Sequence, residues 1–60
     1  METRYCVEMF YNNVFYTVYF ETEKDAKTFS QSLIEFNIYK TPRILKCIIE
    51  ENEIVSMSLI

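Results

Sequence analysis

The sequence contains no glycine, no histidine and no tryptophan, and only one proline and two cysteines. Without glycine it lacks the loops that cradle phosphate groups, because those loops need backbone conformations that a Cβ atom disfavours. Without histidine it lacks the commonest metal ligand and the commonest general base. Two cysteines also fall short of the four thiolates of a cysteine-only zinc site. These absences predict a protein that is not an enzyme, with no catalytic residues, no metal and no cofactor.

Long apolar runs are also missing. No stretch approaches the roughly 18–20 apolar residues that span a bilayer, so we expect no membrane association. Residues 1–9 lack the apolar core of a signal peptide. These features predict a cytoplasmic protein with reduced cysteines, in the host cytoplasm if the gene is viral.

Basic residues are few: six stand among nine acidic ones, for a net charge of −3. Proteins that bind the nucleic-acid backbone usually carry a basic face, because neutralising phosphates releases counterions. Nucleic acid is therefore not the expected partner.

Hydrophobic residues, by contrast, make up half of the 60 residues, and ten residues are aromatic. This composition excludes a disordered chain. Residues 1–60 have the length of one small domain, whose burial of surface is marginal. Disulfides and metals are the usual supports of such domains, and both are unpromising here. Association with another chain is the support that remains, and a homodimer is the simplest form.

Asn12 and Asn13 divide two runs of β-forming residues, 3–11 and 14–21. Asparagine tolerates positive φ, so a two-residue hairpin turn is predicted between Tyr11 and Val14. This register creates two faces. One is apolar throughout and is expected to face the core: Tyr5, Val7, Met9, Tyr11, Val14, Tyr16, Val18 and Phe20. The other carries Arg4, Cys6, Glu8, Phe10, Phe15, Thr17, Tyr19 and Glu21.

Helical spacing follows this hairpin. Thr22 and Asp25 have the spacing of a capping box, which places the helix start at Thr22. An apolar stripe recurs at Ala26, Phe29, Leu33 and Phe36. Asn37 suits the left-handed position after a helix.

A second hairpin is predicted from residues 43–49 and 53–59, joined by a three-residue loop of Glu50, Glu51 and Asn52 with Asn52 left-handed. Its two faces hold different residues. The face expected to meet the helix holds Leu45, Cys47, Ile49, Val55, Met57 and Leu59. The opposite face holds Ile44, Lys46, Ile48, Ile54, Ser56 and Ser58.

The predicted fold class is therefore α+β: a single small β-β-α-β-β domain, with a four-stranded antiparallel sheet and one helix packed on one face. The crossover through the helix places the first strand beside the third.

One helix covers one side of a sheet, so the other side is expected to expose a cluster of apolar residues. We predict that this cluster is the partner interface, because clusters of this size usually mark one. Its predicted members are Phe10, Phe15, Tyr19, Ile44, Ile48 and Ile54. Cross-strand pairing on a solvated face is the structural alternative.

Two further groups complete the candidate sites. Cys6 and Cys47 fall on opposite faces in the predicted registers, so no bridge between them is expected. Glu50, Glu51 and Glu53 form an acidic surface at the second turn, either as a solvated turn or as a mimic of phosphate charge.

The functional prediction is a small non-enzymatic interaction module, homodimeric through the outer sheet face. Residues with AT-rich codons (Phe, Tyr, Met, Ile, Asn and Lys) make up 28 of the 60 residues. This composition is typical of AT-rich genomes, which include low-GC bacteria, their phages, and some archaea and their viruses. Together with the small size and the acidity of the chain, it favours a viral or mobile-element inhibitor of a host nucleic-acid-binding or defence protein, with an unidentified host protein as partner. Two alternatives are a single-stranded nucleic-acid binder that stacks bases on its sheet and a structural or assembly subunit.

Overall fold

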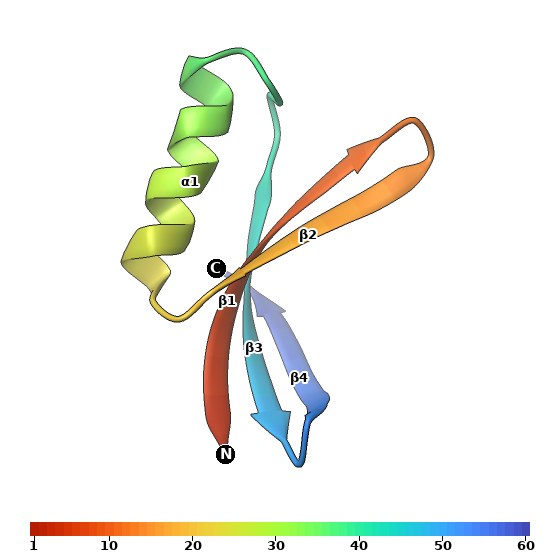
Figure 1. The fold of residues 1–60 in the computed structure, drawn as a ribbon, viewed down its shortest axis with the longest axis vertical. Coiled ribbons are helices and arrows are strands. Elements are labelled where there is room, and N and C mark those ends of the chain that lie inside the picture. The colour runs from red at the N-terminus through yellow and green to blue at the C-terminus, as the bar shows by residue number, and fades with distance from the viewer.

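A computed structural model describes all 60 residues as four strands and one helix. The elements are β1 (Glu2–Tyr11), β2 (Val14–Phe20), α1 (Glu23–Glu35), β3 (Arg43–Glu50) and β4 (Glu53–Leu59). The strands form one antiparallel sheet in the order β2-β1-β3-β4. Helix α1 lies on one side of this sheet, and the turns of the two hairpins point in different directions (Figure 1). The predicted fold class is confirmed, including the position of β1 beside β3.

The first hairpin has the predicted register. Tyr11 lies opposite Val14, and Phe10 lies opposite Phe15. Asn12 and Asn13 have φ angles of 52° and 63°, which is the pattern of a type I′ turn. Two adjacent asparagines adopt this turn at low cost, because they are among the few non-glycine residues that tolerate the left-handed region.

Both ends of α1 are closed by local hydrogen bonds. The backbone N–H of Asp25 donates to Thr22 Oγ1 over 3.1 Å, so Thr22 is the N-cap, a contribution of about 1 kcal/mol. At the other end Asn37 has a φ of 56°. The N–H groups of Asn37 and Ile38 donate to the carbonyls of Ile34 and Leu33. These are the two bonds of a Schellman motif, so both predicted helix boundaries are confirmed.

The core under the helix is centred on Val7, Ala26 and Leu33, with several half-buried side chains around them. The surrounding side chains are Tyr5, Met9, Phe20, Phe29, Tyr39 and Ile44. The rings of Phe20 and Phe29 lie 5.3 Å apart. This cluster joins β1, β2 and β3 to the helix.

Three aromatic residues expected in this core are exposed instead. Phe36, the C-cap residue of α1, is 72% exposed, and Tyr11 and Tyr16 are about half exposed or more. The tip of the β1–β2 hairpin extends away from α1 (Figure 1). The alternation along the hairpin was predicted correctly, but the helix does not reach its far end.

The second hairpin differs from its predicted form. Glu50 pairs with Glu53, so the turn has two residues rather than three, and both Glu51 and Asn52 have positive φ. Ile49 pairs with Ile54 while Ile48 pairs with Ser56, which leaves Val55 as a bulge. The extra residue that the prediction placed in the loop is therefore accommodated inside β4.

The second hairpin also turns its other face to the helix. Val7 lies opposite Ile44 and Cys6 lies opposite Leu45, and directly opposed residues share a face. Ile44 therefore packs under the helix, whereas Leu45 and Cys47 lie on the side away from it. The predicted assignment of these faces was wrong, because β3 is apolar on both faces and its alternation alone does not orient it.

The limited reach of the helix accounts for the polar residues of β4. Helix α1 contacts β1, β2 and β3 but not β4. The helix-side positions opposite Lys46 and Ile48 are Ser58 and Ser56. Their hydroxyls remain in water, so no burial penalty arises.

The geometry of the second turn predicts opposite effects on stability when Glu51 and Glu50 are each replaced by glycine. Glu51 has a φ of 50°, which costs an L-residue without a local polar partner about 1–2 kcal/mol. Glu51→Gly should therefore stabilise the protein by about 0.5–1 kcal/mol in urea denaturation. Glu50→Gly removes the same charge from the extended strand and should destabilise by about 0.5–1 kcal/mol. Equal destabilisation by both variants would contradict the two-residue turn.

Candidate protein interface on the outer sheet face

The outer face is the side of the sheet that points away from α1. The pairing of β1 with β2 and β3 puts Cys6, Tyr19 and Leu45 in one row across it. Further positions follow from the same registers. They are Arg4, Glu8, Phe10, Phe15, Arg43, Cys47, Ile54, Met57 and Leu59. No other element of the chain covers this face.

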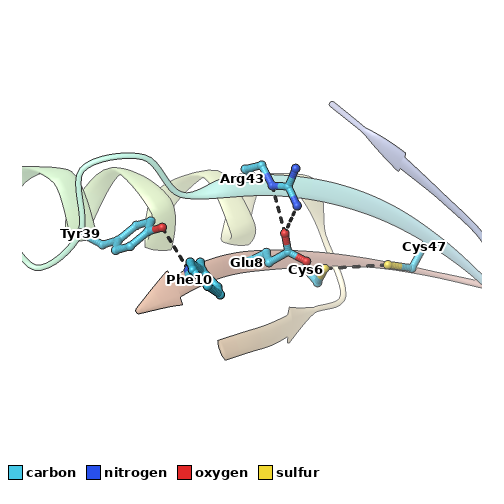
Figure 2. Close-up of polar contacts among 6 residues, drawn as sticks. All are labelled: Cys6, Glu8, Phe10, Tyr39, Arg43 and Cys47. Atoms are coloured by element: carbon cyan, nitrogen blue, oxygen red, sulfur yellow. Dashed lines mark hydrogen bonds and ion pairs between the residues drawn. The ribbon is translucent and has the colours of Figure 1, made fainter. Parts of the chain in front are cut away.

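The centre of the outer face is a buried cluster of Cys6, Leu45 and Cys47. Both thiols are fully buried and unbridged. The Sγ–H group of Cys47 donates to Cys6 Sγ over 4.0 Å (Figure 2). The expectation that the two cysteines lie on opposite faces was wrong, because it depended on the incorrect orientation of the second hairpin.

The surroundings of the thiols change their acidity. Burial, followed by the neighbouring Cys47, raises the pKa of Cys6 from 9.0 to about 11. The pKa of Tyr19 is raised by burial and by the charges that Cys6 and Cys47 can carry. Tyr19 lies directly opposite Cys6, and the raised pKa of Cys6 keeps its thiol protonated at neutral pH.

A pair of aromatic rings extends the apolar surface beyond the thiols. The centroids of Phe10 and Phe15 lie 4.6 Å apart at an interplanar angle of 49°. Strand β1 continues past the start of β3, so the N–H of Phe10 has no strand partner there. Instead it donates to the hydroxyl of Tyr39 over 3.0 Å (Figure 2). Tyr39 therefore closes the sheet edge beside the two rings.

The charges on this face are paired. Arg43 Nε donates to Glu8 Oε1 over 3.0 Å, and the second guanidinium nitrogen, Nη2, contacts the same oxygen (Figure 2). This hydrogen bond raises the pKa of Arg43. Arg4 lies 3.5 Å from Glu2. The face is consequently apolar at its centre and close to electrically neutral around it.

Six large apolar side chains of the outer face are 44% to 63% exposed: Phe10, Phe15, Tyr19, Ile54, Met57 and Leu59. Half-exposed side chains of this size present on the order of 100 Å² each, or roughly 600 Å² together. That is at the upper end of the largest patches on ordinary monomers. It approaches the ≈ 800 Å² that each partner buries in a standard interface.

Four of the six predicted interface residues belong to this surface and two do not. Phe10, Phe15, Tyr19 and Ile54 lie on it, whereas Ile44 and Ile48 lie on the helix side. Met57 and Leu59 were missed. The alternation of Ser56 and Ser58 with these two residues could have revealed them, because it marks the opposite face of β4 as the polar one.

The predicted acidic surface lies at one end of the sheet. Glu50, Glu51 and Glu53 surround the β3–β4 turn and are exposed. Glu2 pairs opposite Ile49 and so joins them at this end, where the N-terminus lies beside the turn (Figure 1). Four carboxylates thus gather there, apart from the apolar centre of the outer face.

Comparisons with known proteins do not add a function. No protein-family model matches the chain, and neither the curated proteins nor the solved structures gave a match. The structure contains no helix with the length and apolar character needed to cross a lipid bilayer. Functional arguments therefore rest on the geometry of the outer face.

The raised pKa of Cys6 predicts a loss of stability at alkaline pH. The folded state holds the thiol proton more tightly than the unfolded state does. The resulting stabilisation is complete below pH 9.0 and disappears as the pH rises to about 11. Urea denaturation of the wild type should show the unfolding free energy falling across this window, by an amount of order 1 kcal/mol more than in Cys6→Ala. Parallel pH profiles for the two proteins would contradict the assignment.

Proposed function

We propose that this protein is a non-enzymatic protein–protein interaction module that forms a homodimer through its outer sheet face. The observation that carries the proposal is the apolar surface around Cys6, Leu45 and Cys47, which no element of the chain covers. Only seven of the 60 residues are buried within the chain. Self-association would add the burial that so small a domain needs.

The chemistry of the outer face favours a second copy of the same chain as the occupant. A two-fold interface brings the same patch of both subunits together, so the patch must be compatible with itself. An excess of one charge would repel its copy, but Glu8 and Arg43 compensate each other here. The exposed aromatic and aliphatic side chains can pack against their own equivalents.

The biological role that we propose for the dimer is inhibition of a host nucleic-acid-binding or defence protein by a viral or mobile-element product. The support is the AT-rich composition together with the acidic end formed by Glu2, Glu50, Glu51 and Glu53. Exposed carboxylates at one end of the sheet suit a basic groove on another protein.

A matched pair of substitutions tests the homodimer. Light scattering should give the wild type twice the chain mass of 7.3 kDa. Phe15→Asp puts a carboxylate among the exposed aromatic side chains of the interface, where an unpaired charge is costly to bury. The variant should shift toward the monomer and melt at a lower temperature, with a stronger dependence on concentration.

Phe36→Asp is the control, because Phe36 is more exposed than Phe15 and lies at the end of α1. It introduces the same charge and should leave the mass unchanged. A wild type that remains a monomer at high concentration would eliminate the homodimer. A Phe15→Asp variant with wild-type mass and melting would eliminate the outer face as an interface.

Single-stranded nucleic-acid binding is the alternative function, because Phe10, Phe15 and Tyr19 present three rings on one sheet face. Both arginines of that face lie beside carboxylates, which leaves few free cations for phosphates. We therefore expect no binding to single-stranded DNA or RNA tighter than the roughly 10⁻⁴–10⁻⁶ M of non-specific contact. Fluorescence anisotropy with labelled oligonucleotides measures this. Submicromolar affinity that falls steeply with salt would favour the alternative.

A further inference from the structure

Besides the outer face, the chain has an apolar hollow on the helix side of the β1–β2 hairpin. It has a volume of about 370 Å³ and is lined by Met9, Tyr11, Tyr16, Ile38 and Tyr39. Met9 packs against the core under the helix and lies opposite Tyr16, which places this hollow on the face opposite the proposed dimer interface. The hollow would therefore stay accessible in the homodimer.

The walls of the hollow are held in place by backbone hydrogen bonds. The N–H groups of Ile38 and Tyr39 both donate to the carbonyl of Leu33, over 2.9 Å and 3.1 Å. The hydroxyl of Tyr39 accepts the N–H of Phe10 over 3.0 Å. The loop wall is thus tied to both the helix and β1. Ordering of this wall would therefore cost little free energy when a ligand binds.

The lining favours a cation that is planar and rich in hydrogen-bond donors. Three tyrosine rings line the hollow and no charged side chain does. Aromatic faces attract cations, and arginine is the side chain most often found there. The hydroxyls of Tyr11 and Tyr16 make no hydrogen bond within the chain. They are therefore free to accept hydrogen bonds, and a guanidinium carries five donors.

We propose that this hollow, termed the tyrosine pocket, receives an arginine side chain from a partner protein. This inference rests on the proposed function, because a basic target surface supplies the arginine. The net charge of −3 attracts such a surface. Tyrosine and arginine are also the residues enriched at the energetic centres of protein interfaces. Lys40, which follows Tyr39 and is exposed, is the cation nearest to the lining residues in the sequence.

Two small probes test the charge requirement directly. Nα-acetyl-arginine amide should shift the ring proton resonances of Tyr11, Tyr16 and Tyr39 saturably, with a dissociation constant on the order of 10 mM. Nα-acetyl-citrulline amide has nearly the same shape without the charge and should leave these resonances unchanged. Equal binding of both probes, or no saturable shift with arginine amide, would overturn the proposal.

Two variants test the residues. Tyr16→Leu keeps the apolar bulk but removes one ring, so it should lower the affinity for arginine amide about two- to fivefold. Tyr16→Phe keeps the ring and should retain most of the affinity. Lys40→Glu lies outside the core and should strengthen binding about two- to threefold at low salt, with the gain lost at high salt.

The oligomeric state is measured separately by light scattering. A monomeric protein that still binds arginine amide would refute the homodimer and retain the tyrosine pocket. A dimer that binds the arginine and citrulline probes equally would refute the tyrosine pocket and retain the homodimer.

Discussion

The pairing of β1 with β3 determines the arrangement of the rest of the molecule. Val7 lies opposite Ile44, and Cys6 lies opposite Leu45. A shift of this register by one residue would move every side chain of the second hairpin to the other face. The pairing therefore decides that Ile44 completes the core under the helix. It also decides that Leu45 and Cys47 join Cys6 on the outer face, where the two thiols meet.

The short helix limits how much of the sheet is covered. Thirteen residues give α1 a length of about 20 Å. It contacts β1, β2 and β3, while β4 and the tip of the first hairpin lie beyond it. Two apolar regions consequently stay open, one on each side of the sheet. The outer face is broad and nearly neutral, which suits a second copy, whereas the tyrosine pocket is narrow and aromatic, which suits a single side chain.

Local signals predicted the first turn and both ends of the helix. The turn at Asn12 and Asn13, the cap at Thr22 and the left-handed Asn37 all follow from side chains acting on their own backbone. The register of the first hairpin followed from its turn, because a two-residue loop leaves one way to pair the strands. The bulge at Val55 was not predicted, because a loop of three residues and a turn of two with a bulge use the same number of residues.

The sequence by itself determined the elements, their order and four residues of the candidate interface, since alternation and capping are encoded within each segment. Only the tertiary structure decided which face of the second hairpin meets the helix. Ile44 and Ile48 on one face of β3 and Leu45 and Cys47 on the other are all apolar, so either face could have been buried. That choice depends on contacts with Val7 and Ala26, which are distant in the chain. It brought together Cys6 and Cys47, and it moved Met57 and Leu59 to the outer face.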